Sequence, residues 1–217
     1  MPRPLVIGYH LVWTIYGTWL PNDPRGSGSR TVESPAIEQL GDLHYGRKRV
    51  QPSRNEVQAF YARATSQLAH PVVRLNNSTI AIVANAFAEV IAAENYTCYA
   101  CAILPDHVHL AIRKHKHQSE VMAENLKQHS RKQLGTHGYA DRAHPVWTAG
   151  RGWRTYLEHP DDVRRTIGYI ERNPLRDGLP PQRWSFVTPY DGWPLHPGHS
   201  PDSPYAKALR AVGKYPG

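Results

Sequence analysis

Apolar residues recur along the first half of the chain with periods that predict strands alternating with helices. Residues 5–16 and 96–104 are nearly continuous apolar runs, as in buried strands. Residues 107–113 alternate strictly between apolar and polar positions, which is typical of a strand with two different faces. Residues 55–70 and 77–94 repeat their apolar positions at helical spacing, so each is expected to form a helix.

The second half of the chain continues this alternation. The pattern predicts a helix over 119–134, a strand over 153–157 and a final helix over 160–173. Pro160 suits the first turn of that last helix, where a missing N–H costs nothing. Pro174 follows it and is expected to stop it, because proline lacks the N–H that would continue the ladder.

The resulting order is strand, helix, strand, strand, helix, strand, helix. Its first six elements match the β-α-β-β-α-β arrangement of the ferredoxin-like fold. We therefore predict an α+β protein with an antiparallel sheet, helices on one face, and one added C-terminal helix. The opposite face of the sheet is expected to be open for a ligand. The catalytic domain is expected over residues 1–179, with a loop-like insertion at 17–53 and an extended tail at 180–217.

The balance of charge favours a polyanionic partner. The chain carries 26 Lys and Arg against 18 Asp and Glu, a formal net charge of +8. Nucleic-acid binding favours such a balance because each neutralised phosphate releases counterions, although charge alone does not separate a DNA-binding protein from a merely basic one. No apolar run is long enough to span a bilayer, and the N-terminus lacks a secretory pattern, so we expect a cytoplasmic protein without a membrane partner.

The two cysteines, Cys98 and Cys101, form a C-x-x-C pair within a predicted strand. Redox pairs of this spacing sit at the start of a helix, and a zinc site would need a second pair. The strand period places the two side chains on opposite faces. We therefore interpret them as ordinary core cysteines.

A pair of histidines on the alternating strand is the first candidate for chemistry. His107 and His109 share one face because a single residue separates them, and that geometry presents two nitrogen ligands to one divalent ion. The alternative is that they are ordinary solvent-facing histidines. Among 13 histidines in the chain an H-x-H pair arises readily by chance. The interpretation as a metal site therefore depends on the position of this pair within an alternating strand.

A tyrosine on the last predicted helix is the second candidate. Tyr169 and Asn173 are four residues apart and so lie on one helical face. Tyr169 falls outside the apolar stripe of Val163, Ile167 and Ile170, which leaves its hydroxyl available. A phenolate can attack phosphorus and form a covalent phosphotyrosine. The alternative is a packing or surface tyrosine, of which a chain with 12 tyrosines has several.

Together these elements resemble a known family. A strand with His-apolar-His and a later helix with Y-x-x-x-N-P resemble the single-tyrosine HUH transposases of bacterial insertion sequences, and more narrowly the REP-associated tyrosine transposases. The matching segments are Leu104-Pro-Asp-His-Val-His-Leu110, Tyr169-Ile-Glu-Arg-Asn-Pro-Leu-Arg-Asp-Gly-Leu179, Tyr9-His10 and Pro145-Val146-Trp147.

The resemblance implies a ferredoxin-like catalytic domain that acts on single-stranded DNA containing hairpins or REP-like palindromes. In it, His107 and His109 correspond to the ligands of a divalent metal, Mg²⁺ or Mn²⁺, and Tyr169 to the nucleophile that forms a 5′-phosphotyrosine. Asn173 stands where the insertion-sequence enzymes usually carry Gln as a further ligand. Because Asn is one methylene shorter, a water would have to bridge it to the metal unless it coordinates directly.

Basic and aromatic side chains are the candidates for DNA contacts. Phosphate contacts position DNA without reading its sequence, and aromatic rings stack on unpaired bases. The basic candidates are Arg47, Lys48, Arg49, Arg113, Lys127, Arg131 and Lys132. The aromatic ones are Trp13, Trp19, Trp147 and Trp153, for most of which core packing is the competing interpretation.

Two other functions stay open at this point. The first is a non-catalytic module that binds single-stranded nucleic acid on the same sheet. The second is a metal-dependent nuclease in which His107 and His109 activate a water, so that no protein-linked strand forms. The sequence also allows a homodimer in which the helix bearing Tyr169 serves the partner's histidines.

Overall fold

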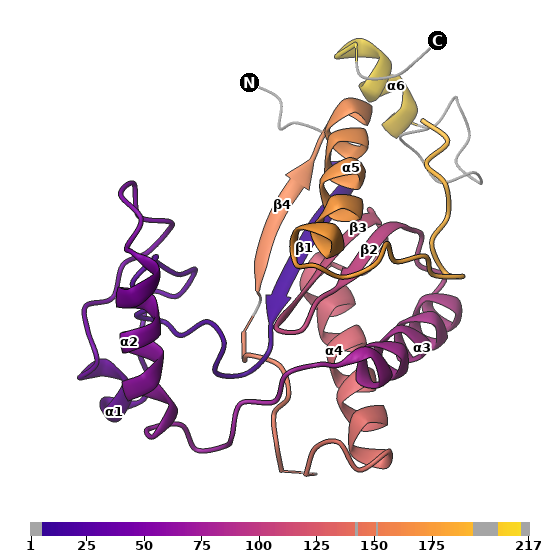
Figure 1. Ribbon diagram of the computed structural model, residues 1–217. Coiled ribbons are helices and arrows are strands. Elements are labelled where there is room, and N and C mark those ends of the chain that lie inside the picture. The colour runs from indigo at the N-terminus through magenta and orange to yellow at the C-terminus, as the bar shows by residue number, and fades with distance from the viewer. Residues whose placement is uncertain (1–5, 142, 151, 193–203, 214–217) are drawn as a thin grey trace.

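The computed structural model describes residues 6–141, 143–150, 152–192 and 204–213, and Figure 1 shows the arrangement of its helices and strands. The elements follow in the order β1 (Gly8–Thr14), α1 (Pro35–Glu38), α2 (Arg54–Thr65), α3 (Asn77–Glu94), β2 (Cys98–Ile103), β3 (His107–Arg113), α4 (Ser119–Thr136), β4 (Trp153–Leu157), α5 (Pro160–Arg176) and α6 (Pro204–Ala211). None of the helices in the described residues is both long and apolar enough to cross a membrane.

The strands form one antiparallel sheet in the order β2-β3-β1-β4. This order, with α3 between β1 and β2 and α4 between β3 and β4, is the ferredoxin-like arrangement, and it confirms the predicted α+β class. The bounds predicted for β3 and β4 are confirmed to the residue. The strand β1 is shorter than the apolar run that predicts it, because pairing with β3 and β4 extends only from Gly8 to Thr14.

One face of the sheet carries the main core. Alternate residues of β1 and β3, among them Leu11 and Leu110, point toward α3 and α4 and are almost fully buried. Phe87 of α3 and Leu126 of α4 are fully buried in the same cluster. These two helices pack on each other and form a complete layer, as the apolar alternation predicts.

The helix α5 covers β2 and β3 on the opposite face of the sheet, so the expectation of an open face is wrong for these two strands. Small side chains at Ala100, Ala102 and Ala111 let the helix approach, and Val163 and Ile170 of α5 are buried against them. The apolar stripe of α5 therefore finds its burial on the sheet itself. As a result, the histidine-bearing face lies under a helix rather than in open solvent.

The helix α5 runs three residues beyond its predicted end and includes Pro174. Proline removes one helical hydrogen bond, the one that would reach the carbonyl of Ile170. The loss falls near the end of the helix, where Asp177 N–H still bonds the Asn173 carbonyl at 3.2 Å. At the other end Pro160 occupies the first turn as predicted, and His159 accepts a capping hydrogen bond from Asp161 N–H.

The cysteines are buried and unpaired, which agrees with core cysteines, but they do not point to opposite faces. Both belong to the cluster beneath α3 and α4, whereas Tyr99 and Ala100 between them face α5. A shift of register between Cys98 and Ala100 inserts an extra residue and reverses the alternation. Burial raises the pKa of Cys98 to about 12, so its thiol is unreactive near neutral pH.

The chain after α5 covers the free edge of β2. The side-chain amide of Gln182 bonds both the N–H and the carbonyl of Ile103, at 2.8 and 2.7 Å. Trp184 Nε1 donates to the carbonyl of Cys101, and Thr188 N–H donates to that of Cys98. This edge would otherwise present unpaired backbone groups to solvent. The first part of the predicted tail thus satisfies backbone groups at the edge of β2.

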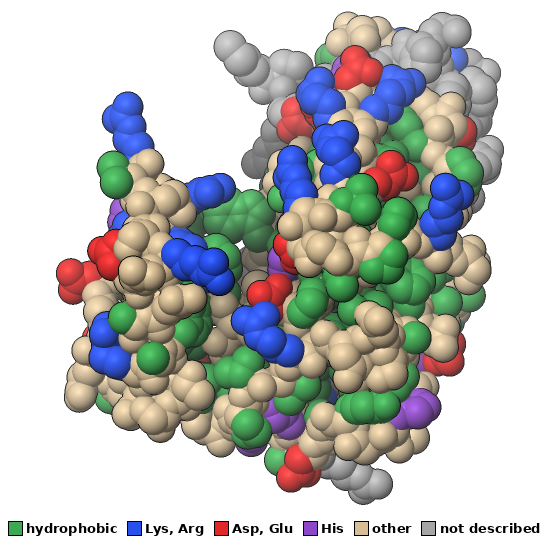
Figure 2. Space-filling model, viewed as in Figure 1, with side chains coloured by type: hydrophobic (Ala, Val, Ile, Leu, Met, Phe, Trp, Pro, Cys, Tyr) green, Lys and Arg blue, Asp and Glu red, His purple; other side chains and the backbone are tan. Residues whose placement is uncertain are grey.

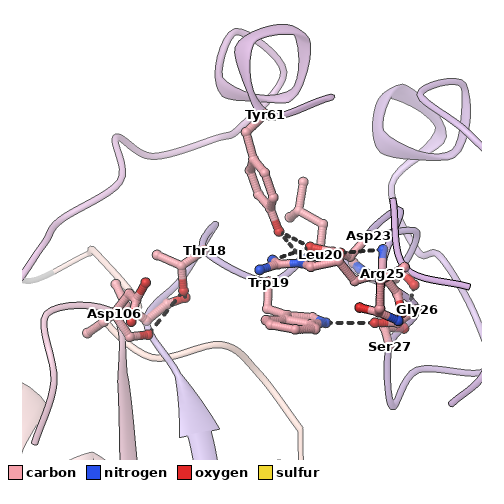
Figure 3. A network of polar contacts seen from close by, with 12 residues as sticks. Thr18, Trp19, Leu20, Asp23, Arg25, Gly26, Ser27, Tyr61 and Asp106 are labelled. Carbon is pink, nitrogen blue, oxygen red and sulfur yellow. Dashed lines mark hydrogen bonds and ion pairs between the residues drawn. The ribbon is translucent and has the colours of Figure 1, made fainter. Parts of the chain in front are cut away.

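The stretch 17–53, expected to be a loop-like insertion, forms a small helical lobe beside the sheet together with α2 (Figure 1). Leu20, Ile37 and Phe60 are buried together in a core of their own. At its centre the carboxylate of Asp23 is fully buried, where it receives two hydrogen bonds from the Arg25 guanidinium, one from the Arg25 backbone N–H and one from the Tyr61 hydroxyl (Figure 3). A buried carboxylate is tolerated because it is paired and hydrogen-bonded.

Candidate active site

Three histidines meet on the face of the sheet that α5 covers. His107 and His109 lie on β3 and point to this face, as their alternation predicts. The neighbouring strand β1 contributes His10, whose Nε2 is 3.0 Å from Nδ1 of His109. In the sequence, only the family resemblance singles out His10. Its proximity to His109 follows from the β1–β3 register, in which His10 pairs with Ala111 and Val12 with His109.

Each histidine of the pair has a partner at Nδ1. The Asp106 carboxylate lies 2.6 Å from Nδ1 of His107, and Arg74 forms an ion pair with the same carboxylate at 3.5 Å. When Nδ1 of His109 donates its hydrogen bond to His10, both rings keep the Nε2 lone pair for another ligand. Metal-ligating histidines are held in this way by a partner on the other ring nitrogen. The two side chains therefore fit a divalent ion by their donor chemistry.

Burial keeps the inner histidines uncharged. It lowers the pKa of His10 to about 4 and, with the added charges of His107 and His10, that of His109 to about 3. Both imidazoles are consequently neutral near pH 7, the form that can bind a metal or accept a proton. Within the ranges that the structure describes, no group of three or more His, Cys, Asp or Glu side chains is arranged to hold a metal.

Tyr169 lies directly against this cluster. Its ring centroid is 5.5 Å from that of His109 and 5.8 Å from that of His10, both in edge-to-face geometry. The side chain stays 37% exposed because it lies outside the apolar stripe of α5, as its position in the sequence predicts. Three elements far apart along the chain thus bring a phenol and two neutral imidazoles together.

Asn173 is on the same helical face as Tyr169, but its amide is directed to its own helix. Nδ2 donates to the carbonyl of Tyr169 at 3.0 Å, and the residue is only 8% exposed. Among the described residues, its side chain forms no hydrogen bond with His107 or His109. The structure therefore brings together the two histidines and the tyrosine, while the metal-binding role of Asn173 stays a prediction.

A shallow cleft of about 480 Å³ opens beside the cluster. Its lining includes His10 of β1, Thr155 of β4, and Arg165, Thr166 and Tyr169 of α5. The cleft thus contains hydroxyl groups, the imidazole of His10 and one guanidinium, together with the carboxylates of Glu158 and Asp162. The hydroxyls and the guanidinium can donate hydrogen bonds to a phosphate ester, whereas the two carboxylates oppose it by charge.

Two of the cations predicted to bind DNA are structural. Lys127 is 6% exposed, and its ammonium donates to the carbonyls of Thr148 and Gly150 at 3.0 and 3.1 Å. Arg113 is 5% exposed and lies 3.9 Å from Asp191. Amphipathic periodicity does not reveal these roles, because the carbonyls that Lys127 bonds come from a distant loop.

The other predicted cations are accessible but lie apart from the histidines. Arg131 and Lys132 are exposed on α4, in the layer on the opposite side of the sheet. Arg47, Lys48 and Arg49 belong to the helical lobe, where Arg47 and Arg49 are exposed. Neither group contributes to the cleft beside Tyr169.

Replacing Lys127 is expected to affect stability rather than DNA binding. In Lys127→Ala the carbonyls of Thr148 and Gly150 lose their donor, and we expect unfolding to become easier by about 1–3 kcal/mol. Urea denaturation measures this change. Lys132→Ala, an exposed position on the same helix, should be neutral. A Lys127→Ala protein of unchanged stability but several-fold weaker DNA binding would contradict the structural role.

An arginine stripe on α5, absent from the basic residues predicted to bind DNA, flanks the tyrosine. Arg165, Arg172 and Arg176 stand at positions −4, +3 and +7 relative to Tyr169, so one helical face carries all four. All three arginines are exposed, and the Arg176 guanidinium is 5.6 Å from the ring of Tyr169. Figure 2 shows Lys and Arg side chains gathered over α5. The spacing of these arginines is visible in the sequence. Only the structure shows that the tyrosine between them lies against the histidine cluster.

Comparison with known proteins gives structural neighbours only. No family model matches the sequence, and no curated protein matches it. A structure of a REP-associated tyrosine transposase bound to a REP hairpin is similar to this chain with a TM-score of 0.41 and 14% identity, over 100% of this chain and 87% of that one. A protein of Deinococcus radiodurans R1 described as a transposase is similar with a TM-score of 0.35 and 15% identity, over 79% of this chain and 94% of that one.

Both neighbours are thus described as transposases, and the first belongs to the group that the sequence motifs resemble. Likeness of this degree does not transfer roles between individual residues. The roles of His10, His107, His109 and Tyr169 therefore depend on the geometry of this site.

Proposed function

We propose that this protein is a transposase-type enzyme that cuts and rejoins single-stranded DNA through a covalent bond to Tyr169. One observation carries the proposal: α5 holds a half-exposed tyrosine with its ring 5.5 Å from that of a buried, neutral histidine on the central sheet. A packing tyrosine would be expected in the apolar stripe, and a surface tyrosine would not meet a histidine cluster.

In the proposed step the phenolic oxygen of Tyr169 attacks the scissile phosphorus. A bond forms between that oxygen and phosphorus, and the bond from phosphorus to the 3′-oxygen breaks. The phenolic proton passes to water, because the Nε2 lone pairs of His107 and His109 are kept for the metal and Nε2 of His10 accepts the hydrogen bond from His109. The released 3′-oxygen takes up a proton. Since the 5′-phosphotyrosine retains the energy of the broken ester, another 3′-hydroxyl can reverse the step and join strands.

His107 and His109 are the side chains that would hold a divalent metal, Mg²⁺ or Mn²⁺. When bound, such an ion supplies charge that polarises the phosphate. Asp106 and His10 support the proposal because they orient the two imidazoles through Nδ1. Two nitrogen ligands favour Mn²⁺, and oxygen atoms from the phosphate, water or Asn173 suit either ion.

The proposed partner is single-stranded DNA beside a hairpin, on the strength of the motif resemblance. The arginine stripe gives a path for its backbone along α5, past Tyr169. These contacts would position the strand without reading its bases. Sequence selection would then depend on groups outside the stripe.

Removing the stripe should weaken binding in a salt-dependent way. Each phosphate contact to single-stranded DNA contributes about 0.7 to the slope of log K against log salt. We therefore expect Arg172→Gln combined with Arg176→Gln to lower that slope by about 1.4. Fluorescence anisotropy over a salt series measures it. The matched control, Arg131→Gln combined with Lys132→Gln on α4, should leave the slope unchanged, and the reverse result would place the DNA on the other layer.

A covalent-trapping assay tests the proposed function. The protein is mixed with end-labelled hairpin-containing single strands and Mg²⁺ or Mn²⁺, and adducts are resolved on a denaturing gel. A labelled protein band whose modified peptide maps to α5 is the expected result. Cleavage without any adduct would instead favour a hydrolytic nuclease, and binding without cleavage of any strand would favour a binding module.

A further inference from the structure

Trp153 is an aromatic side chain that the folded protein leaves open on the face of the proposed active site. Of the four tryptophans considered for base stacking, Trp13 and Trp147 are 3% exposed in the core. Trp19 lies under the Arg25 guanidinium, 3.8 Å from its ring centre. Trp153, the first residue of β4, is 51% exposed. Packing thus accounts for three of these rings and leaves one without an assigned role.

The strand register places Trp153 in line with the histidines. Val12 pairs with His109 on one side and with Trp153 on the other, and directly paired residues project from the same face of a sheet. Two strand spacings separate Trp153 from His109, a distance of about 10 Å. The helix α5 packs mainly over β2 and β3, so it leaves the start of β4 uncovered.

The backbone on either side fixes the position of this ring. Gly152 has φ +67°, and a Cβ built there would lie 2.4 Å from the carbonyl oxygen of Val12, so only glycine fits at the start of β4. From the helical lobe, Gly28 approaches one edge of the indole, where a built Cβ would be 3.5 Å from a ring carbon. The indole is therefore supported at its edge and exposed elsewhere.

We infer that Trp153 is the stacking platform for an unpaired base next to the phosphate that Tyr169 attacks. The inference rests on the proposed function and adds a route for the strand. The backbone would cross the cleft between Arg165 and Thr155, and a flanking base would lie on the indole. An unpaired base fits this place because the ring is exposed, aromatic and two residues from Thr155, which lines the cleft, in a protein of net charge +8. Base stacking on aromatic side chains tolerates any base sequence.

The test measures DNA affinity in a Tyr169→Phe background, so that binding is separated from cleavage. A mixed-sequence single strand and the matching duplex are compared by fluorescence anisotropy. Trp153→Ala should bind the single strand about 5- to 100-fold more weakly and the duplex with little change. Trp153→Phe should restore most of the affinity, because it keeps an aromatic face. Tyr139→Ala removes an exposed ring beyond the end of α4 and serves as the control.

Photocrosslinking provides a second readout that does not depend on stability. Single strands carrying 5-bromodeoxyuridine at successive positions should crosslink to the peptide that contains Trp153. If Trp153→Ala binds single strands like its parent and no crosslink reaches that peptide, the inference is overturned, and Trp153 serves only to pack the helical lobe. If Trp153-dependent binding persists but the wild-type chain forms no adduct with any strand, the proposed function fails while the platform stands.

Discussion

Tyr169→Phe is expected to abolish the covalent adduct while leaving the fold and DNA binding intact. The substitution removes only the hydroxyl, and the ring keeps its edge contacts with His10 and His109. Without the nucleophile, strand cleavage should fall by roughly 10³-fold or more. The measurement is single-turnover cleavage of a labelled hairpin strand, with the affinity of the same strand followed in parallel.

The control for this variant is a second exposed tyrosine away from the site. Tyr139 lies beyond the end of α4, and Tyr139→Phe should cut at the wild-type rate. A Tyr169→Phe enzyme that still cuts at more than a tenth of that rate would show that water is the nucleophile. In that case the two histidines would belong to a hydrolytic nuclease.

Removal of the histidine pair is expected to be the second largest effect. His107→Ala or His109→Ala takes away one of two nitrogen donors, and cleavage should fall by about 10²- to 10³-fold, since charge stabilisation by a metal contributes several kcal/mol. A chelator should have the same effect on the wild-type protein. Binding of Mn²⁺ itself, measured by calorimetry without DNA, should weaken by at least about tenfold in either variant.

Two further variants separate ligation from packing in this experiment. His137→Ala changes an exposed histidine at the end of α4 and should leave Mn²⁺ binding unchanged. Asp106→Asn keeps the shape of the partner of His107 but weakens its hold on Nδ1, so Mn²⁺ should bind about 10- to 100-fold more weakly. Unaltered Mn²⁺ affinity in His107→Ala and His109→Ala together would exclude this pair as the metal site.

The sequence determined the elements and the chemistry that each of them carries. Strict alternation in β3 put His107 and His109 on one face, and the apolar stripe of α5 left Tyr169 outside the buried side, as the structure confirms. These features are local, because a period of two or 3.6 residues fixes which side chains share a face. The strand and helix order likewise sufficed to predict the ferredoxin-like sheet.

Only the tertiary structure decided which distant residues meet. The β1–β3 register brought His10 to His109, and the β1–β4 register brought Trp153 into the same row. Lys127, an expected DNA contact, became a buried donor because a loop 21 and 23 residues away offered two carbonyls. Long-range strand pairing and the packing of a distant loop set these outcomes, and neither leaves a periodic signal in the sequence.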